Sequence, residues 1–384
     1  MKILHIYKGY PPVVGGIENH LRLLAEAQAR RGLDVTVLVT SRDGPTSVRD
    51  ERGVRVIRTR AWARFRSTPL SPGMVGWVRR LRPDVTHLQF PYPPGELAHR
   101  LFGCSKATVV TYQSDIVRQR WLATLYAPGI RRLLRDCDRI LVTSPAYLQS
   151  SPYLREAAAR CSVVPLGIDP NPFQNVDPAG AERIRQREGS PLVLFVGRLR
   201  YYKGLDLLID AAAAIDGRIL VVGHGPMGRP WKRRAAASPA AARIRFAGEV
   251  SDTDLPLYYA AADVVVLPSS RRSEAFGQVL LEAMAAARPV VSTELGTGTS
   301  FVNQHGKTGL VVANGDTKGL ADAVNSLLRQ PERGRTMGAN GQRRVHEEFH
   351  VERMVERTLK VYRQALATGD RRSGPEEVTT RGAS

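Results

Sequence analysis

Short apolar runs alternate with amphipathic, helix-like segments along most of the 384-residue chain. The runs are rich in Val, Ile and Leu, which is typical of strands buried on both faces of a parallel sheet. We predict strands at residues 3–7, 34–39, 54–58, 85–88, 108–111, 140–142 and 162–164 in the first half, and at 192–196, 218–222, 244–246, 264–267, 290–292 and 309–312 in the second. This repeated alternation predicts an α/β fold with two Rossmann-like, doubly wound sheets in series.

A proline-rich segment separates the two halves. Residues 165–172 contain three prolines and one glycine, a composition that breaks helices and strands and suits a hinge. We therefore predict one domain over residues 1–168 and a second over 169–350. A helix over 351–366 should complete the fold, and residues 367–384, which lack apolar periodicity, should form a disordered tail.

The chain carries a formal net charge of +20 and has a sequence pI near 10.5. Residues 1–168 hold 26 Lys and Arg against 12 Asp and Glu, and the densest basic stretch runs over 49–66. Two interpretations have equal weight: a solvated arginine-rich surface, or one that binds anionic lipid or a lipid diphosphate through Arg58, Arg60 and Arg64. The patterns of RNA-binding modules and DNA-recognition motifs are missing, so we expect no nucleic acid partner.

No apolar run approaches the roughly 18 residues that a membrane-spanning helix needs. The first seven residues predict a strand and lack the long apolar core of an export signal. We therefore expect a cytoplasmic protein.

Ligands of open α/β sheets bind at the carboxyl ends of the strands, so the loops after strands are the places to look for chemistry. After the first strand, Gly15 and Gly16 precede a helix, where backbone N–H groups can approach an anion closely. The pair is a candidate phosphate or acceptor loop. Taken alone, a tight turn between strand and helix explains it better.

In the second half, Arg198 and Lys203 follow the predicted strand at 192–196. Two cations in this position can hold a diphosphate and neutralise the charge that it gains as a leaving group. The alternative is two ordinary surface cations of a basic protein, but their place after a central strand favours the functional interpretation.

A glycine-rich loop at residues 223–228 matches the dinucleotide fingerprint GxGxxG and supports a rival function, an NAD(P)-dependent oxidoreductase. The loop follows the second strand of its half and contains Pro226, whereas the fingerprint normally opens the first βαβ unit. A loop that touches a nucleotide, with Gly225 as the contact, explains the match equally well.

The most specific feature is the segment 273–284, which follows the predicted strand at 264–267. Glu274 should lie in the loop, Gly277 near the helix start and Glu282 on the helix. Both carboxylates can then point along one edge of a cleft and accept hydrogen bonds from the hydroxyls of a sugar and a ribose. The alternative is a salt-bridged helix face.

Together these motifs resemble the retaining glycosyltransferases of family GT4, which have the GT-B fold of two Rossmann-like domains facing across a cleft. The resemblance covers nearly everything up to the tail. It rests on Gly15-Gly16, Gly197-Arg198, Lys203-Gly204, Gly223-His224-Gly225-Pro226, Phe246-Ala247-Gly248 and the Glu-x7-Glu pair of Glu274 and Glu282. It implies an acceptor domain at residues 1–168, a nucleotide-sugar donor domain at 169–350, and no metal or other cofactor.

More narrowly, residues 200–205, 273–277 and 294–303 resemble bacterial O-antigen mannosyl- and D-rhamnosyltransferases. That similarity implies a GDP-linked donor, GDP-mannose or GDP-D-rhamnose. It also implies an acceptor glycan on undecaprenyl diphosphate. Such an acceptor would place the enzyme at the inner face of the cell membrane, where its arginine-rich half meets an anionic surface.

The resemblance implies a role for each motif residue. Arg198 and Lys203 would bind the diphosphate and Glu282 the ribose, while Glu274 would hold the sugar hydroxyls. Retaining members are thought to react on one face of the sugar, with the leaving phosphate guiding the incoming hydroxyl, so stabilisation of the diphosphate charge would dominate catalysis. The other implied donor contacts are Gly15, Gly16, Gly225, Phe276, Gly277 and Gln278.

One segment departs from the family pattern. Residues 111–119 resemble a family segment whose third position is usually histidine, and here that position is Gln113, with Asp115 nearby as a further donor contact. A glutamine can exchange hydrogen bonds with a sugar hydroxyl but cannot take a proton. The runner-up function is therefore a nucleotide-sugar-binding protein with little turnover.

Two other features have weaker claims. Asp136-Cys137-Asp138 matches the DxD motif of metal-dependent transferases, but it precedes the predicted strand at 140–142, so solvated charges at a helix end explain it better. His87 closes a predicted strand, where it either faces the cleft or packs in the core.

Overall fold

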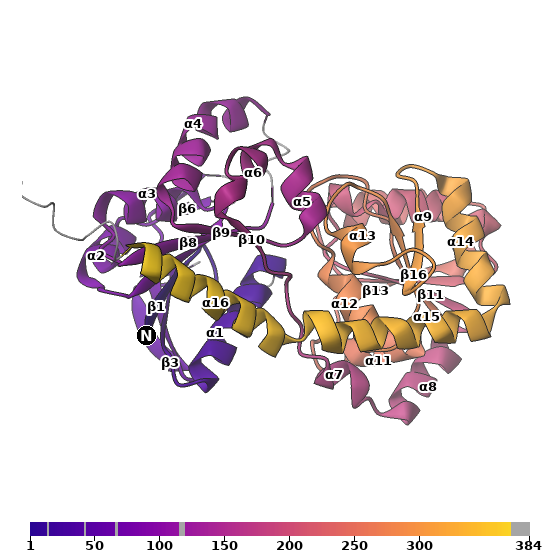
Figure 1. Ribbon diagram of the computed structural model, residues 1–384. Helices are drawn as coiled ribbons and strands as arrows, with labels where there is room; N and C mark the ends of the chain where they lie inside the picture. The colour runs from indigo at the N-terminus through magenta and orange to yellow at the C-terminus, as the bar shows by residue number, and fades with distance from the viewer. Residues whose placement is uncertain (14, 42–43, 66–67, 115–119, 370–384) are drawn as a thin grey trace, which may run out of the picture.

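The computed structural model describes residues 1–13, 15–41, 44–65, 68–114 and 120–369 of the protein, which form two α/β lobes (Figure 1). Each lobe is built on its own sheet of mainly parallel strands, with helices on both faces. This arrangement confirms the predicted fold class of two similar sheets in series.

The first sheet has eight strands in the order β10-β9-β8-β7-β1-β2-β4-β3, and neighbouring strands are parallel except β4 and β3. The seven predicted strands are all present, with limits within two residues. The strands are β1 (Lys2–Ile6), β2 (Asp34–Ser41), β3 (Ser47–Glu51), β4 (Val54–Arg60), β7 (Val85–Phe90), β8 (Ala107–Tyr112), β9 (Arg139–Val142) and β10 (Cys161–Val163).

Part of the arginine-rich stretch forms strands that the apolar pattern did not predict. These are the antiparallel edge strand β3 and a hairpin of β5 (Ala63–Phe65) and β6 (Thr68–Leu70). Strand β3 has the sequence Ser-Val-Arg-Asp-Glu and is largely exposed. An edge strand with no buried face needs no apolar run, so pattern analysis misses it.

The second sheet is entirely parallel, in the order β13-β12-β11-β14-β15-β16. Strands β12 and β13 lie on one side of β11, and β14, β15 and β16 lie on the other. The strand order therefore reverses between β11 and β14, and the loops after these two strands meet there. The strands are β11 (Leu192–Val196), β12 (Arg218–Val222), β13 (Ile244–Gly248), β14 (Val264–Leu267), β15 (Val290–Thr293) and β16 (Gly309–Val312).

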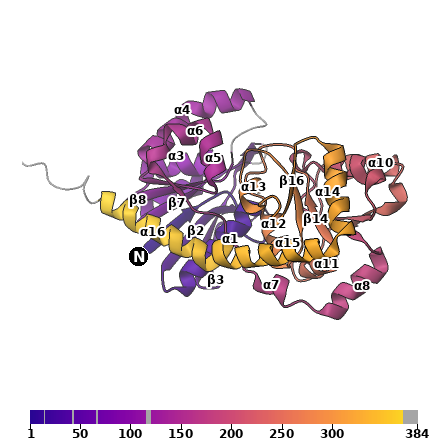
Figure 2. The same cartoon turned by 45° about the vertical axis from the view of Figure 1, so that its right-hand side comes forward.

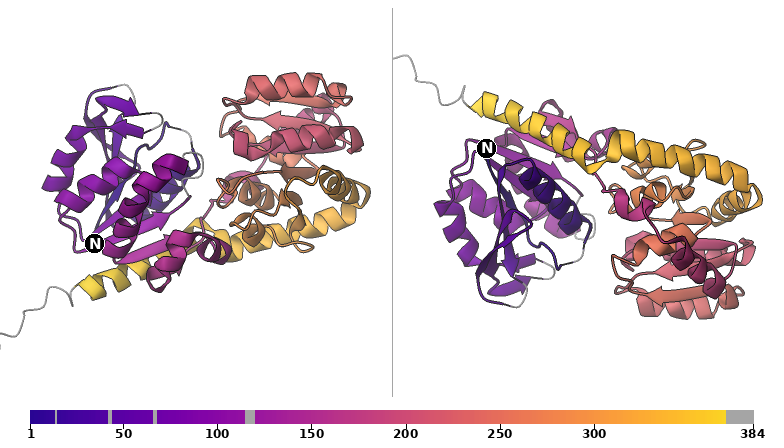
Figure 3. Two further views of the ribbon diagram at one scale, coloured as in Figure 1. Left: turned by 90° about the horizontal axis from the view of Figure 1, so that it is seen from above. Right: turned by 90° about the horizontal axis from the view of Figure 1, so that it is seen from below.

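Helices cover both faces of each sheet (Figures 1 and 3). Those of the first lobe are α1 (Gly16–Arg30), α2 (Pro72–Arg80), α3 (Pro93–Phe102), α4 (Arg120–Asp136), α5 (Pro145–Ser150) and α6 (Pro152–Glu156). Those of the second are α7 (Asn171–Gln174), α8 (Pro178–Glu188), α9 (Leu205–Ala211), α10 (Gly228–Ala236), α11 (Leu255–Ala261), α12 (Gln278–Ala285), α13 (Thr299–Val302), α14 (Thr317–Arg329) and α15 (Pro331–Arg344).

The chain crosses between the lobes twice, and the two crossings touch. Ile168 donates its N–H to the carbonyl of Phe349 and accepts from the N–H of Val351, at 2.8 and 2.9 Å. The last helix, α16 (Val351–Gly369), then runs back along the first lobe beside α1 (Figure 2), where Leu359 and Tyr362 enter the first core. One lobe is thus closed by a helix that follows the other in sequence.

Helix α16 continues to Gly369, so it is three residues longer than the predicted 351–366. The rest of the predicted tail, residues 370–384, lies outside the described residues. Within the part of the chain that the structure describes, no helix is both long and apolar enough to cross a bilayer.

Candidate active site

A buried ion pair joins Lys203 to Glu274, with 2.6 Å between Nζ and Oε2. Lys203 ends a 3₁₀ turn (Tyr201–Lys203) after β11, and Glu274 lies in the loop after β14, so they meet where the strand order reverses. Each side chain is only 10% exposed. Desolvation makes such a pair weak as a source of stability, and its place at the reversal favours a role in ligand binding.

Further contacts fix the two loops that carry this pair. The Ser269 hydroxyl donates to the Glu274 carboxylate at 3.1 Å, and Thr297 donates to the Glu274 carbonyl at 2.8 Å. Gly204 has a φ of 64°, and a side chain there would collide with the carbonyl oxygen of Pro268. Only glycine allows the two loops to approach this closely.

Glu282 lies on α12 and accepts a hydrogen bond from the Tyr259 hydroxyl at 2.6 Å. Burial raises the pKa of the Glu282 carboxyl, an effect that Tyr259 and Lys203 oppose. Burial lowers the pKa of the Lys203 ammonium, but Glu274, Tyr202 and Glu282 together more than offset this, so its pKa lies above the ordinary value. The two carboxylates and Lys203 therefore form one electrostatic cluster, and Glu282 has no ion-pair partner on its own helix among the described residues.

The starts of two helices meet at the junction of the lobes. A Cβ atom on Gly16, which begins α1, would lie 3.3 Å from Oε1 of Gln278, which begins α12. Gly15 and Gly277 are the residues before these helices, and Phe276 is buried beneath the second. Helix N-termini attract anions, so the junction favours negative charge.

Lys8, directly after β1, belongs to this junction and was missed in the sequence. The pKa of its ammonium is lowered, mainly by burial. Glu18 opposes this shift, and the like charges of Arg200 and Arg198 add to it. Lys8 of the first lobe thus lies within electrostatic range of two cations of the second. Arg198 is exposed, and its guanidinium has no hydrogen-bond or ion-pair partner among the described residues, so an anion between the lobes could satisfy it.

Gln113 lies at the carboxyl edge of the first sheet. It follows β8 and donates from Nε2 to Oε1 of Gln89 at 2.8 Å, and both residues are buried. Because β7 and β8 are parallel neighbours, the two amides sit together at the end of the sheet that carries Lys8. Asp115 lies outside the described residues, so its expected role stays a prediction.

Comparison with known proteins decides what kind of site this is. The family models "Glycosyltransferase Family 4" and "Glycosyl transferases group 1" match residues 14–172 and 180–344. The chain is 36% identical to O-antigen chain mannosyltransferase C of Escherichia coli, over 95% of this chain and 99% of that protein. It is 38% identical to D-rhamnosyltransferase WbpZ of Pseudomonas aeruginosa, over 91% of this chain and 92% of that protein.

The chain belongs to the GT4 glycosyltransferases. A solved structure with the same fold is sucrose-phosphate synthase from Thermosynechococcus elongatus, at a TM-score of 0.80 and 25% identity, over 96% of this chain and 99% of that one. The GT-B fold is therefore confirmed. The family also implies a nucleotide-sugar donor, and the rival prediction of an oxidoreductase is wrong.

In this GT4 protein the glycine-rich loop at 223–228 packs two site loops together. A Cβ atom on Gly225 would lie 2.5 Å from the carbonyl oxygen of Leu199, and the Leu199 N–H donates to the His224 carbonyl at 3.0 Å. The loop after β12 therefore lies against the loop that carries Arg198. Close backbone packing explains the fingerprint match without a dinucleotide.

Arg272 links the Glu274 loop to the first lobe, a role that no sequence motif indicated. Its guanidinium donates to the Ser150 hydroxyl at 2.9 Å and to the Gly296 carbonyl at 3.1 Å, and lies 5.9 Å from the ring centre of Tyr147. Ser150 and Tyr147 belong to α5. A single arginine in an arginine-rich chain carries no distinguishing signal.

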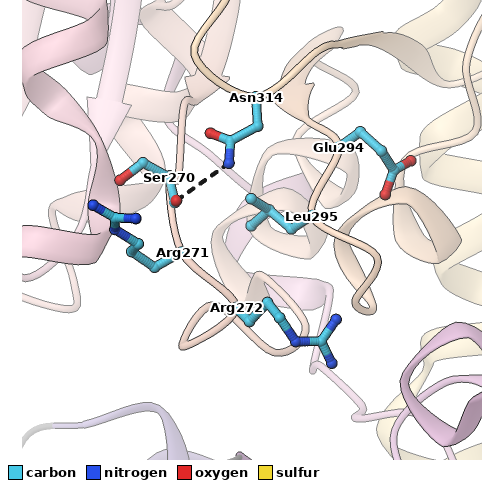
Figure 4. A pocket seen from close by; sticks show the side chains of 6 residues that line it. All are labelled: Ser270, Arg271, Arg272, Glu294, Leu295 and Asn314. Atoms are coloured by element: carbon cyan, nitrogen blue, oxygen red, sulfur yellow. Dashed lines mark hydrogen bonds between the residues drawn. The ribbon is translucent and has the colours of Figure 1, made fainter. Parts of the chain in front are cut away.

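A cavity of about 380 Å³ adjoins this contact (Figure 4). None of the predicted site residues lines it. The lining residues are Ser270, Arg271, Arg272, Glu294, Leu295 and Asn314. The side chains of Arg271 and Arg272 point in opposite directions in Figure 4, so they do not form a paired-cation site for phosphate.

The DxD match is structural in this glycosyltransferase. Asp136 ends α4 and pairs with Arg132 at 3.6 Å, and the Asp138 carboxylate accepts from the Thr108 N–H at 2.8 Å. Among the residues that the structure describes, no three His, Cys, Asp or Glu side chains are grouped so as to hold a metal ion. Metal independence stays a prediction.

Proposed function

We propose that this glycosyltransferase transfers mannose or D-rhamnose from a GDP-linked donor, with retention of configuration and without a metal ion. The acceptor is a glycan on undecaprenyl diphosphate, in O-antigen synthesis. The observation that carries the proposal is the near full-length similarity, at 36 and 38% identity, to a mannosyltransferase and a D-rhamnosyltransferase.

The choice of sugar rests on what these two hexoses share. D-rhamnose is 6-deoxy-D-mannose, so both have the same configuration at C2, C3 and C4. We assign recognition of these hydroxyls to the Glu274 carboxylate and to the backbone of Phe276 and Gly277, before α12. A carboxylate fixed by Ser269 and Lys203 can still accept from sugar hydroxyls, because its two oxygens offer about four acceptor positions.

The diphosphate is assigned to the junction of the lobes, between the helix that begins at Gly16 and the Lys203 loop. Lys203, Arg198 and Lys8 supply positive charge there, and the start of α12 adds its dipole. We propose that these groups stabilise the charge that develops as the donor departs. Glu282, held by Tyr259, is assigned to the ribose hydroxyls.

The proposed reaction needs no enzyme nucleophile. The acceptor oxygen forms its bond to C1 on the face from which the diphosphate leaves, and the acceptor proton passes to the departing phosphate oxygen. Gln113 cannot take a proton, so no proton transfer is routed through this position. Its amide, oriented by Gln89, is assigned a hydrogen bond to the donor sugar.

We propose that the first lobe works at the cytoplasmic face of the membrane. The excess of basic residues in this half supports an anionic partner. The contact expected for Arg58 stays a prediction, and it competes with bonds that the guanidinium already makes to Glu51 at 2.5 Å and to the Pro11 carbonyl at 2.6 Å. Arg60 and Arg64 are exposed and remain candidates.

A panel of nucleotide sugars tests the donor. Purified protein is incubated with GDP-, UDP- and dTDP-sugars, with and without EDTA, and both thermal stabilisation and sugar release are measured. GDP-mannose or GDP-D-rhamnose should stabilise the protein and be turned over in EDTA. Preferential turnover of a UDP- or dTDP-sugar, or complete loss of activity in EDTA, would contradict the proposal.

A further inference from the structure

Five glutamates are buried in the part of the chain that the structure describes, and all but Glu18 have a partner for their carboxylate. Glu18 lies on α1, is 8% exposed and makes neither a hydrogen bond nor an ion pair with any described residue. A buried carboxylate without a partner is costly, so its presence calls for an explanation. The other four pair as follows: Glu26 with Arg52, Glu96 with the N–H of Tyr92, Glu188 with Arg187, and Glu274 with Lys203.

Glu26 is the natural comparison, because it lies on the same helix and is equally buried. It is also 8% exposed, and its Oε2 lies 3.4 Å from the guanidinium of Arg52 and 3.5 Å from that of Arg22. Burial on α1 therefore does not by itself deprive a carboxylate of partners. Glu18 differs from Glu26 in where its carboxylate lies.

The Glu18 carboxylate points back toward the loop between β1 and α1. A Cβ atom on Gly15 would collide with its Oε2, and one on Gly9 would lie 3.5 Å from its Oε1. Both glycines follow β1, so the carboxylate lies at the carboxyl edge of the first sheet. We call this edge of each sheet, where the parallel strands end and the assigned donor groups lie, its working edge.

A capping role does not account for this carboxylate. Glu18 is the third residue of α1, a position from which a glutamate can accept from the N–H that precedes the helix. That N–H belongs to Gly15, and within the described residues it makes no such bond to Glu18. The charge of Lys8 is close enough to interact, but no ion pair joins the two side chains in the described structure. The carboxylate oxygens thus keep their accepting positions open.

The charge of Glu18 favours a neutral hydroxyl over a phosphate as its partner. The diphosphate is assigned beside Gly16, two residues before Glu18, and a carboxylate at this distance repels it. Donor binding therefore gains nothing from a negative charge at this position. A hydroxyl, in contrast, forms a charge-assisted hydrogen bond to a carboxylate. Sugar hydroxyls are the neutral donors that a glycosyltransferase brings to this junction.

Two sugars meet at the site, and the place of Glu18 favours the acceptor sugar. The donor sugar is assigned to Glu274 and Gln113, whereas Glu18 lies beside the helix start that is assigned to the diphosphate. In the proposed reaction, the acceptor oxygen reaches C1 on the face from which the diphosphate leaves. A group of the first lobe that lies next to the diphosphate is therefore next to the incoming acceptor.

We infer that the Glu18 carboxylate accepts a hydrogen bond from a hydroxyl of the acceptor sugar and so orients that sugar for attack on C1. This inference rests on the proposed transfer reaction. The hydroxyl that Glu18 holds is a neighbour of the attacking one, whose proton passes to the departing phosphate, so Glu18 takes no proton. Gly15 belongs to the arrangement, because a side chain there would push the carboxylate away.

Transfer kinetics of Glu18→Gln test the assignment. The variant keeps the shape of the side chain but removes its charge, so a charge-assisted hydrogen bond becomes a neutral one. The donor is GDP-mannose, and the acceptor is a mannose-terminated glycan on undecaprenyl diphosphate in detergent micelles. The KM for the acceptor should rise at least about tenfold, whereas kcat should fall less than about threefold. A kcat that falls about 100-fold with an unchanged KM would overturn the inference, because Glu18 would then act on the reacting proton.

Binding of GDP separates an acceptor role from a donor role. Because Glu18→Gln removes a negative charge near the diphosphate, its Kd for GDP should be equal to that of the wild type or lower. Isothermal titration calorimetry measures this Kd without any acceptor. A Kd for GDP that rises about tenfold would overturn the inference, since Glu18 would then serve the donor.

Glu26→Gln is the matched control, because it removes an equally buried charge from the same helix. Its KM for the acceptor and its Kd for GDP should stay within about twofold of the wild type, since the Glu26 carboxylate already has its partners in Arg22 and Arg52. Circular dichroism verifies that both variants fold. If Glu26→Gln raises the acceptor KM as much as Glu18→Gln does, the loss of a buried charge on α1 explains both results and the inference fails.

The same measurements distinguish a failure of this inference from a failure of the proposed function. If the wild type transfers no sugar from GDP-mannose or GDP-D-rhamnose to the lipid-linked glycan, the proposed function fails, and the assignment of Glu18 fails with it. If the wild type transfers sugar and the acceptor KM of Glu18→Gln equals that of Glu26→Gln, the function stands and only the assignment of Glu18 fails.

Discussion

The two lobes share an architecture but differ in the polar cluster that each buries most deeply. The second lobe buries a charged pair, Lys203 and Glu274, at its working edge. The first lobe buries a neutral network in its core: His87 bonds to the hydroxyls of Tyr362 and Thr111, at 2.6 and 2.5 Å. The buried ion pair of the second lobe thus lies where a charged ligand is expected, whereas the neutral network of the first lobe holds the fold.

The neutral network explains how α16 is attached. Gln28 lies between His5, at 2.7 Å, and Tyr362 of α16, at 3.3 Å. Tyr362 therefore joins the last helix to β1, α1 and β7 through one set of hydrogen bonds. His87 packs in the core, which decides between the two interpretations that its strand position left open.

Removing the charged pair should give the largest effect on activity. Glu274→Gln keeps the shape of the side chain but removes its charge, and Lys203→Met removes the partner. Each should lower kcat/KM at least about 100-fold, because both groups are assigned to the donor. Steady-state kinetics with the preferred GDP-sugar, together with circular dichroism to verify folding, measure this.

The matched control is an exposed pair in the same lobe. Lys318 and Asp322 lie 2.6 Å apart on α14, and both are well exposed. Asp322→Asn should leave kcat/KM within about twofold, because exposed pairs contribute little. Activity of Glu274→Gln as high as that of Asp322→Asn would remove the site assignment.

The buried histidines should make the first lobe sensitive to acid. Burial lowers the pKa of His5 from 6.5 to about 4 and that of His20 to about 3. Since the unfolded chain binds protons first as the pH falls, stability is fully present above about pH 6.5 and is lost as the pH falls toward 4. Between about pH 6.5 and 4, protonation linked to each histidine should lower the free energy of unfolding by about 3 kcal/mol.

Urea unfolding between pH 7 and 4.5 measures this loss. Both ring nitrogens of His20 lack a partner within the described structure. His20→Met should therefore unfold at a lower pH than the wild type. His224 is exposed, so His224→Gln should follow the wild-type curve. A His20→Met curve that matches the wild type would contradict the role of burial.

Breaking the network at α16 should have a smaller effect. Tyr362→Phe leaves Gln28 and His87 without a hydroxyl partner in the core, so it should lower the unfolding free energy by about 2 kcal/mol. Sugar release should persist, because this residue lies away from the assigned donor groups. Urea unfolding at pH 7 measures the change, and a loss below about 0.5 kcal/mol would contradict the network.

The smallest expected effect concerns the contact between the lobes. Arg272→Ala should lower kcat about tenfold while leaving the Kd for GDP within about twofold, because Arg272 positions the Glu274 loop and has no assigned ligand contact. Arg271→Ala is the control, since Arg271 is exposed and has no side-chain partner among the described residues. If Arg272→Ala weakened GDP binding as much as it lowers kcat, the assigned role of Arg272 in positioning the Glu274 loop would be contradicted.

Elements with a buried apolar face were predicted well from the sequence, and largely exposed elements were missed. Strands with continuous apolar runs, such as β11 and β14, were found with their limits. Strand β3 is largely exposed, and β5 and β6 have only three residues each, so none of them carries an apolar run. Lys8 could have been found, because it follows its strand as directly as Arg198 follows β11.

Pairings between distant segments could not be predicted. Lys203 and Glu274 are 71 positions apart, and their contact depends on two loops that touch at Gly204 and Pro268. Neither segment contains a sequence pattern that indicates its contact with the other. For the same reason, the hydrogen bond between Tyr259 and Glu282 could not be predicted from the sequence.

A crystal structure of the protein with GDP-mannose would test the central claim most directly. The account predicts diphosphate oxygens within about 3 Å of Lys203 or Arg198, with sugar hydroxyls at Glu274 and ribose hydroxyls at Glu282. A diphosphate bound instead in the cavity beside Arg271, with these four side chains free of ligand, would contradict it.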